Sequence, residues 1–433
     1  MKTSHRVSGA ALAVLVMAAL TSCGSDSGTA ADGTVTLKFL VDNSQATVDT
    51  AKALTDSFMK ANPNIKIETE IRPGGSEGDN IVKTRLSTGD MSDVFWYNSG
   101  SLLQALNPGQ TLVDLTGDAV LADVQKDFLP VVSQDGKVYG VPAGTAMGGG
   151  ILYNRKVYDQ LGLRVPKTWA EFMANNDKVK AAGITPVIGT FKDTWTSQLL
   201  VLGDYYNVQA AVPTFAQDYT ANKAKFATTP AAQAGFDHLA EVHAKGLMQE
   251  GFGSAVADQG MKMLAEGKGA HYPMLSAMLP PLLATMPQAA TDVGFFGIPG
   301  TDPAKHGATI WEPAGLYIPK TTEKLEAAKT FLAYVASPAA ADALNKAVPP
   351  AGPYRISGAE LPEDAIQAAK DLQTYVDESR TAPALEFLSP VKGPSLEQIT
   401  VAVGSGLTSP AEGAAQYDKD VEKQAKQLGL AGW

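Results

Sequence analysis

Alternating apolar and polar positions predict β-strands in the first part of the chain. Residues 35–41 place apolar side chains at every second position, and residues 65–71 do so as well except for Thr69; this is the period of a half-buried strand. Residues 48–58 instead repeat apolar side chains at helical spacing, and the sequence NPN at 62–64 ends that helix. A third strand is predicted at residues 93–97. Strand–helix–strand order implies parallel pairing, so we expect an α/β fold with a doubly wound sheet.

The ends of these strands are where ligand-binding residues are expected, because ligands bind beyond the carboxyl ends of parallel strands. Asp42 and Asn43 follow the first strand, and Tyr97 and Asn98 end the third. We take these four as candidate ligand-binding residues. Strand alternation points Trp96 to the face opposite Tyr97. Asp42 and Asn43 could equally cap the following helix.

A glycine-rich sequence follows a further strand pattern at residues 137–142. It contains Gly144 and the run GGG at 148–150. Strand-like residues beside so many glycines predict a segment that bends while it stays extended. Farther along, Thr168 and Glu171 have the spacing of a capping box, which predicts the start of a helix.

Length and composition limit the classes of protein. With 433 residues, the chain exceeds what one hydrophobic core usually serves, so two domains are expected. The 35 basic and 45 acidic residues give a formal charge of −10, which disfavours nucleic acid as a partner. One cysteine and five histidines exclude a disulfide scaffold and disfavour a histidine metal centre. We expect neither a metal nor a cofactor.

The amino-terminal segment predicts where the protein works. Lys2 and Arg6 precede an apolar run at residues 7–20, which has the length of a signal-peptide core. The small residues before Cys23 resemble a bacterial lipobox, and Cys23 is the only thiol in the chain. We expect residues 1–22 to be removed and Cys23 to carry lipid, although an ordinary secretory signal is the alternative.

A lipid on Cys23 would hold the protein at the outer face of the cell membrane. Each buried acyl CH₂ contributes about 0.8 kcal/mol, so two long chains anchor firmly. Residues 24–33 are small and polar and predict a flexible tether. No later sequence approaches a membrane-spanning apolar length, so we expect attachment through lipid only.

A set of ordered motifs resembles one protein family. Residues 166–172, PKTWAEF, are the most specific of them; the others read NPNIKIE at 62–68, GDMSDV at 89–94, KVYGVP at 137–142, YNR at 153–155 and LAEGKGA at 264–270. In this order and spacing they resemble the extracellular solute-binding proteins of bacterial ABC importers, of the maltose- or oligosaccharide-binding type. The family block that usually ends Gly-Ser-Trp has Ala277 where the Trp is customary.

The resemblance implies a two-lobed type II periplasmic-binding-protein fold, with the ligand between two α/β lobes. It assigns residues 34–145 and 310–350 to an N-terminal lobe, and residues 146–308 and 351–433 to a C-terminal lobe. The glycine-rich residues 143–150 then fall at a hinge. It also implies no enzymatic activity: the protein would bind a carbohydrate, expected to be an oligosaccharide, and deliver it to the transmembrane subunits of an ABC permease. We expect a monomer.

Aromatic side chains are the candidates for stacking on sugar rings. Trp195 has polar neighbours, although a core or interface position is its alternative. Trp311 and Glu312 follow residues 307–310 at the expected second crossover, where the floor of the cleft should lie. Other aromatic or basic residues are expected to serve in packing or on the surface: Tyr205, Tyr206, Tyr272, Tyr354 and Arg355.

Two other functions are considered. Residues 74–78 match the G-x-S-x-G elbow of serine hydrolases, with Ser76 as nucleophile and His271 or His306 as base. Arg72 and Pro73 precede the motif where a buried apolar strand should run, which favours an ordinary loop. A binding protein that serves a sensor rather than a permease is the third possibility.

Overall fold

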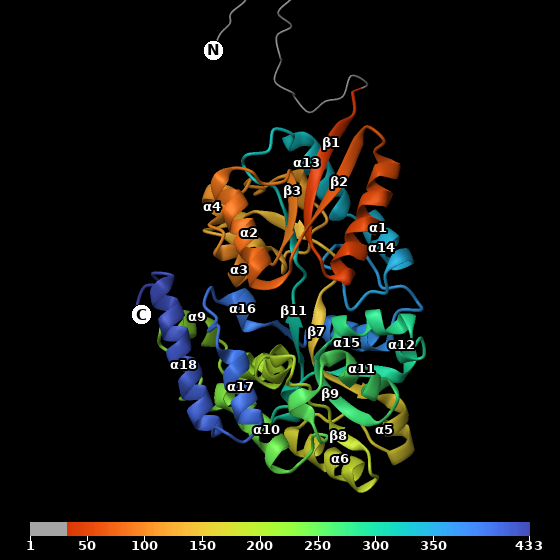
Figure 1. Cartoon of the computed structure of the whole chain (residues 1–433), viewed down its shortest axis with the longest axis vertical. Helices are drawn as coiled ribbons and strands as arrows, with labels where there is room; N and C mark the ends of the chain where they lie inside the picture. Colours follow the sequence, from red (N-terminus) through yellow and green to blue (C-terminus); the bar gives the residue numbers. More distant parts are fainter. Residues whose placement is uncertain (1–32) are drawn as a thin grey trace, which may run out of the picture.

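The computed structural model describes residues 33–433, and Ser76 among them by its backbone alone. The predicted leader, the lipidation candidate Cys23 and all of the predicted tether but its last residue lie outside the described part. Figure 1 shows two lobes stacked along the long axis of the molecule, with β1 to β3 in one lobe and β7 to β9 in the other. No helix of the described part is both long and apolar enough to cross a membrane.

The sheet of the N-terminal lobe has the strand order β2-β1-β3-β12-β6. As the strand–helix alternation predicts, β1 is parallel to both β2 and β3. A strand from much later in the chain, β12, inserts antiparallel between β3 and β6. The strands are β1 (Val35–Asp42), β2 (Ile65–Arg72), β3 (Val94–Tyr97), β6 (Gly140–Pro142) and β12 (Gly315–Tyr317), with a separate hairpin of β4 (Ser133–Gln134) and β5 (Lys137–Val138).

Helices cover both faces of this sheet, as Figure 1 shows for α1 and α2. The helices of the lobe are α1 (Gln45–Ala61), α2 (Gly75–Thr88), α3 (Ser101–Gln104), α4 (Pro108–Thr111), α13 (Leu325–Val335) and α14 (Pro338–Ala347). The Phe331 ring lies with its centroid 5.4 Å from that of Phe39 and 5.0 Å from that of Phe58. Rings from β1, α1 and α13 thus meet in one buried cluster, which joins the early and late parts of the lobe.

The sheet of the C-terminal lobe is built around β7. One edge of β7 pairs antiparallel with β9, and the other pairs with β11 at its first half and β10 at its second half. The outer strands β13 and β8 are parallel to β11 and β9. The strands are β7 (Met147–Asn154), β8 (Thr185–Val187), β9 (Gly269–Leu275), β10 (Val293–Phe296), β11 (Ala308–Trp311) and β13 (Thr381–Pro383).

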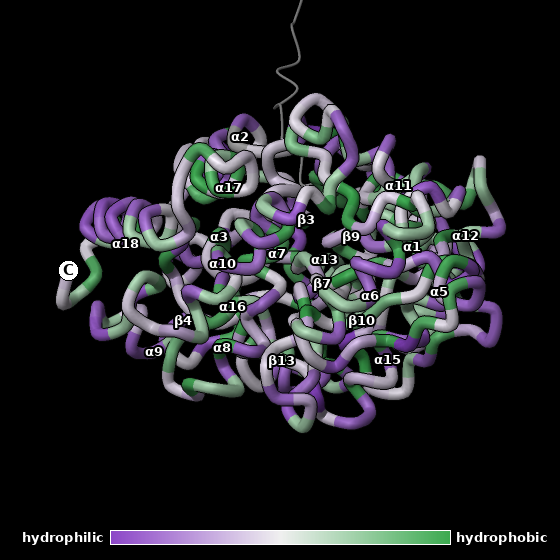
Figure 2. The backbone as a smooth tube through the Cα atoms, turned by 90° about the horizontal axis from the view of Figure 1, so that it is seen from below, coloured by the Kyte–Doolittle hydropathy of each residue, from purple (hydrophilic) through white to green (hydrophobic). Residues whose placement is uncertain are grey.

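Most helices of the molecule belong to this lobe. They are α5 (Arg155–Leu161), α6 (Trp169–Ala181), α7 (Leu199–Leu202), α8 (Tyr205–Ala211), α9 (Phe215–Thr220), α10 (Pro230–Ala244), α11 (Ala257–Ala265), α12 (Ala289–Asp292), α15 (Gln367–Asp377), α16 (Leu385–Leu388), α17 (Leu396–Gly404) and α18 (Pro410–Gln427). The capping box of Thr168 and Glu171 is present at the start of α6, as predicted. In Figure 2 the outer turns of α18 are hydrophilic.

The glycines of β7 do not act as the predicted bend. None of the run at 148–150 has a positive φ, and all lie within the regular strand. A Cβ on Gly149 would lie 1.9 Å from the Trp311 ring, and one on Gly148 would lie 2.6 Å from the Phe295 ring. These glycines therefore make room for aromatic rings. The bend falls earlier, at Gly144, whose φ of +93° favours glycine.

The described chain crosses between the lobes three times. Ala143, Leu316 and Ile356 belong to the N-terminal core. Their counterparts in the C-terminal core are Ala146, Ile310 and Ile366. The returning piece of the N-terminal lobe thus begins after β11 and continues to Ile356, later at both ends than the expected 310–350. The reason is that Ile310 and Trp311 still pair with β7, and the chain crosses only after that ladder ends.

Candidate functional site

A cleft of about 710 Å³ lies between the two lobes. Its walls include parts of two crossovers, Gly144 with Thr145 at the first and Trp311 with Glu312 at the second. Small-molecule sites typically enclose about 300–1,000 Å³, so the cleft has room for a ligand of several rings. It is the principal candidate for the functional site.

The N-terminal lobe contributes the start of α1, the end of β3 and α3. Asp42 lines the cleft, and its carboxylate accepts hydrogen bonds from Ser44 N at 2.9 Å and Thr47 Oγ1 at 3.1 Å. Asp42 does not cap α1, because the N-cap is Ser44; its carboxylate holds the residues of the cap while it lines the cleft. Asn98 also lines the cleft. Further polar lining residues here are Gln45, Asp49, Thr50, Ser99 and Ser101.

Asn43 lies outside this lining. Its Oδ1 accepts a hydrogen bond from Gly74 N at 3.0 Å, and Gly74 is the N-cap of α2. Asn43 thus neither lines the cleft nor caps the following helix, whose N-cap is Ser44; it joins the end of β1 to the start of α2.

The face of β3 that meets the cleft carries Trp96 rather than Tyr97. Trp96 lines the cleft, whereas Tyr97 is fully buried and is not part of the lining. Phe95 and Tyr97 share the other face, where Phe95 packs 5.6 Å from Tyr317. Burial raises the pKa of Tyr97 above its ordinary value. Trp96 and Tyr97 point to opposite faces, as the alternation predicts. The face that meets the cleft is that of Trp96 and not that of Tyr97, because the core of the lobe covers Tyr97.

Trp311 presents its ring at the cleft from the end of β11. The indole lies over Gly149 in β7, where a side chain would collide with it. Its Nε1 donates a hydrogen bond to Glu386 Oε1 at 2.6 Å, and Glu386 Oε2 is 2.9 Å from Lys392 Nζ. Contacts on the ring face and on its nitrogen thus fix the orientation of this side chain before any ligand arrives.

Trp195 lies outside the cleft lining. It belongs to a 3-10 helix, η3 (Thr194–Gln198), and packs half-buried against the core of the C-terminal lobe. The neighbouring Thr194 donates a hydrogen bond to Glu397 Oε2 at 2.6 Å, which holds η3 against α17. The packing alternative considered for Trp195 fits this position, and the sugar-stacking prediction does not.

Glu312 borders the cleft but is committed to an ion pair. Arg355 Nε and Nη2 donate to the two carboxylate oxygens at 2.7 and 2.6 Å. The side chains are only 1% and 4% exposed. Burial raises the pKa of Glu312, and Arg355 opposes this rise. The pair connects the second crossover to the end of the returning segment of the N-terminal lobe, where the third crossover begins. It therefore joins two crossovers to each other.

The charge of the cleft is one-sided. Among the described residues that line it, none is lysine, arginine or histidine, whereas Asp42, Asp49, Glu312 and Glu386 carry carboxylates. Two of these, Glu312 and Glu386, are paired with a cation behind the wall. A phosphate or carboxylate ligand would find no cationic side chain here, so the lining disfavours anions.

The arrangement contains further cleft residues that were not among the sequence candidates. They are Trp96, Glu386 and Phe387. Tyr354, which was expected to serve in packing or on the surface, also lines the cleft, and its hydroxyl donates to Asn345 Oδ1 at 2.8 Å. Trp96 was assigned to the wrong face of its strand. No local pattern marks Glu386 and Phe387, because only the fold brings α16 to the cleft.

The hydrolase alternative is not supported by the placement of its residues. Ser76 begins a helix of the N-terminal lobe, whereas His271 and His306 lie in the C-terminal lobe. His271 is fully buried and bonded to Tyr158 at 2.7 Å and Asn176 at 2.8 Å. Burial lowers its pKa to about 3. The described residues contain no group of three or more His, Cys, Asp or Glu placed to hold a metal.

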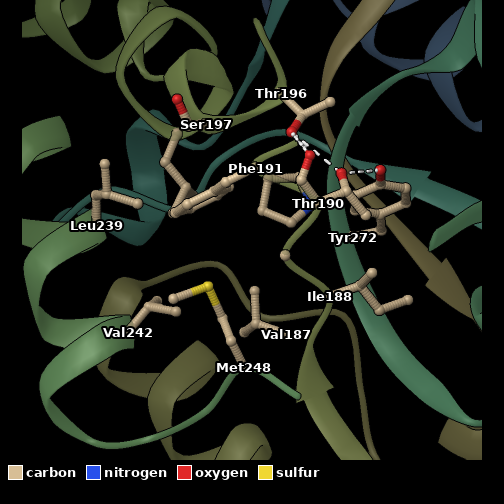
Figure 3. Close-up of a pocket in the computed structure, with 13 residues that line it drawn as sticks. Val187, Ile188, Thr190, Phe191, Thr196, Ser197, Leu239, Val242, Met248 and Tyr272 are labelled. Atoms are coloured by element: carbon tan, nitrogen blue, oxygen red, sulfur yellow. Dashed lines mark hydrogen bonds between the residues drawn. The ribbon is translucent and has the colours of Figure 1, made fainter. Parts of the chain in front are cut away.

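A second pocket lies inside the C-terminal lobe and encloses about 20 Å³. In Figure 3 its lining includes Met248, Phe191 and Tyr272, and Thr190 joins Tyr272 and Thr196 through hydrogen bonds of 2.6 and 3.1 Å. A space of this size holds about one water molecule. It is a packing gap with a small polar network, and it cannot hold a sugar ring.

Comparison with known sequences finds one family and several relatives. Residues 42–342 match the family described as bacterial extracellular solute-binding protein. The chain is 26% identical over 297 residues to the "Multiple sugar-binding protein" of Streptococcus mutans, covering 66% of this chain and 67% of that protein. It is 23% identical over 343 residues to the "Melibiose/raffinose/stachyose-binding protein MelE" of Bacillus subtilis, covering 77% and 78%.

Solved structures agree with this fold. A "Chitin oligosaccharide binding protein" superposes with a TM-score of 0.73 at 20% identity, covering 91% of this chain and 99% of that chain. "SBP RafE in complex with raffinose" has a TM-score of 0.73 at 23% identity, covering 91% and 100%. At these identities the likeness shows the fold, which is the two-lobed arrangement of the solute-binding proteins.

Proposed function

Because the chain belongs to the family of bacterial extracellular solute-binding proteins, we propose that it captures a neutral oligosaccharide in the cleft between its lobes and delivers it to an ABC permease. The observation that carries the choice of ligand is the lining itself. Trp96 and Trp311 supply flat rings, and the cleft has acidic and neutral hydrogen-bonding groups but no lining cation.

The chemistry of a pyranose matches this lining. The C–H faces of a sugar ring pack on aromatic rings, while its hydroxyls need fixed donors and acceptors. Asp42 and Asn98 lie at strand ends, and Ser99 is held by its hydrogen bond to Pro313 O at 2.8 Å. Groups fixed in this way lose little freedom on binding, which favours affinity.

The names of the relatives support the same class of ligand. They include proteins named for multiple sugars, for melibiose, raffinose and stachyose, and for chitin oligosaccharide. These names differ in sugar and in linkage. They therefore support a saccharide for this chain and leave its identity to experiment.

The mode of action follows from the three crossovers. A ligand that touches both lobes shifts the equilibrium toward the closed form by its better contacts there. We propose that Gly144 supplies a bending point and that the protein works as a monomer. We also propose that lipid on Cys23 holds it at the outer face of the membrane.

Calorimetric titration of the purified protein with a panel of neutral mono- and oligosaccharides tests the ligand. We expect at least one sugar to bind with a dissociation constant near the micromolar range, which corresponds to about −8 kcal/mol. Phosphorylated or carboxylated sugars should bind far more weakly. Heat from a peptide or polyamine, and from no sugar in the panel, would contradict the proposal.

Matched tryptophan variants locate the site. Trp311→Ala and Trp96→Ala should each weaken binding by about tenfold, since loss of a stacked ring removes about 0.5–1.5 kcal/mol of ring contact in addition to the buried apolar area. Trp195→Ala is the control, because Trp195 lies outside the cleft lining, and it should bind as the unmodified protein does. Thermal unfolding of all three variants checks that each remains folded.

A further inference from the structure

The two ends of the cleft differ in chemistry. In Figure 1, α3 and α16 lie to the left of the waist between the lobes, whereas α12 and α14 lie to the right. Glu386 and Phe387 of α16 and Leu102 of α3 line the left part. The apolar part of the lining near α12 and α14, which we call the proline end, consists of Ala277, Pro280, Pro281, Ala284, Leu344, Ala347, Val348, Pro349 and Pro350. Tyr354, bonded to Asn345 of α14, and the start of α1, which packs on α14, border it.

The side chains that residues 277–284 bring to the proline end offer no hydrogen-bonding group for a hydroxyl. Residues 277–284 read AMLPPLLA, so no side chain in this stretch can donate or accept a conventional hydrogen bond. Pro280 and Pro281 also lack a backbone N–H. At the end of α14 and just after it, Ala347 and Val348 are apolar, and Pro349 and Pro350 also lack a backbone N–H. A sugar ring seated here would lose water from its hydroxyls and find no side-chain partner in replacement.

This wall is held in place by buried hydrogen bonds. Ser276 has no exposure, its Oγ donates to Ala351 O at 2.8 Å and it accepts from Gly148 N at 2.9 Å. These contacts tie the start of the apolar stretch to β7 and to the segment after Pro350. The wall is therefore a built part of the cleft.

The position of Ala277 adds space at this end. It lines the cleft directly after the tied Ser276, and its side chain is a single methyl group. The proline end therefore presents short aliphatic side chains and proline rings to a ligand. Residues 277–284 contain no aromatic side chain on which a sugar ring could stack. A ligand group that binds to these side chains would gain its binding free energy from the burial of apolar surface.

We propose that the ligand is a glycoside with an apolar substituent, such as an alkyl or aryl aglycone or an acyl group, and that the proline end takes that substituent. This rests on the proposed function, because the sugar part would occupy the region of Trp96 and Trp311. The polar side chains Gln45, Asp49 and Thr50 at the start of α1 line the same cleft and can meet the sugar edge.

Calorimetry with matched glycosides tests the inference. The probes are the methyl, n-hexyl and phenyl glycosides of glucose, galactose and N-acetylglucosamine, used below their micelle-forming concentrations. For at least one sugar, the hexyl or phenyl glycoside should bind about tenfold or more tightly than the methyl glycoside, since each buried CH₂ contributes about 0.8 kcal/mol. Equal affinities within a pair that binds would overturn the inference and leave the sugar proposal standing.

Two variants place the substituent. Ala277→Trp fills the proline end, and Ala284→Asp adds a carboxylate at an exposed position of the same wall. Both should abolish the advantage of the hexyl glycoside and retain binding of the methyl glycoside. Leu407→Trp is the matched control for an added indole, because Leu407 is 81% exposed and lies outside the cleft lining, and it should keep the advantage.

The outcomes separate the two proposals. An advantage that survives in both Ala277→Trp and Ala284→Asp would overturn the assignment of the substituent to this end. Failure of every glycoside in the panel, methyl and hexyl alike, would overturn the inference, whereas the oligosaccharide proposal is overturned only if the oligosaccharides of the first panel fail as well.

Discussion

His238 is a histidine kept neutral by its surroundings. It is 9% exposed and stacks on Trp169 with ring centroids 3.7 Å apart. Its Nδ1 has no hydrogen-bond partner among the described residues. Burial lowers its pKa to about 4, against the opposing effect of Glu241. Its buried position in α10 agrees with a packing role.

Replacement of His238 should change how stability depends on pH. The unfolded chain binds a proton near pH 6.5 but the folded protein only near pH 4, so the free energy of unfolding falls as the pH drops through this window. His238→Phe keeps the stacking and removes the proton. Between pH 7 and pH 5 it should lose about 2 kcal/mol less stability than the unmodified protein. Urea unfolding at both pH values measures this, and identical losses would show that His238 does not titrate in this way.

At the scale of elements, β7 and β11 show how one strand positions the aromatic side chain of another. Three successive glycines, 148–150, leave this part of β7 without side chains, and Thr309, Ile310 and Trp311 pair with Gly149, Gly148 and Met147. The ring of Trp311 therefore lies directly on the backbone of Gly149. Its tilt and depth in the cleft are set by this strand, together with the acceptor Glu386.

Gly149→Ala should disturb the cleft through Trp311. The added methyl group would lie 1.9 Å from the ring, so the indole must move. Overpacking of this kind costs about 1–3 kcal/mol of stability, and we expect sugar affinity to fall by about tenfold or more. Gly253→Ala is the control, because nothing lies within 4 Å of its added Cβ. Calorimetry and thermal unfolding of both variants measure the effects, and unchanged affinity in Gly149→Ala would contradict this account of the Trp311 position.

The same elements show what sequence patterns could and could not predict. The parallel β1, β2 and β3 and the start of α6 follow from local periodicity and capping, because these signals depend on neighbours in the chain. Which face of β3 is buried depends on Tyr317 in β12, more than 200 positions away. The sequence therefore led us to expect Tyr97 at the cleft, where the structure has Trp96. The run of glycines indicated an unusual strand, but its reason is a ring from another element.

At the scale of the molecule, the ion pair of Glu312 and Arg355 joins two of the segments that connect the lobes. Asp127 of the N-terminal lobe lies 3.3 Å from Arg355 Nη1 and is mostly exposed. Both members of the main pair are buried, so each satisfies the charge of the other where water cannot. Their sequence separation of 43 explains why Glu312 was expected to serve the ligand instead.

Glu312→Gln should destabilise the protein by about 3–5 kcal/mol, because it leaves the Arg355 charge buried without its main partner. Replacement of both residues, Glu312→Leu with Arg355→Met, should cost less than either single change, since no uncompensated buried charge remains. Urea unfolding of the single and double variants at neutral pH provides the comparison. If the double variant is less stable than each single variant, the ion pair contributes more to the free energy of unfolding than the neutralisation of two buried charges.

The insertion of β12 between β3 and β6 also determines when the protein can fold. Synthesis begins at the amino end, yet residues 315–317 emerge only after the entire β7–β11 region. Until then, β6 lacks the neighbour that joins it to the sheet. Pairing over such distances along the chain is slow. The N-terminal lobe therefore stays incomplete while most of the polypeptide is being synthesised. This delay favours export of the chain in an unfolded state.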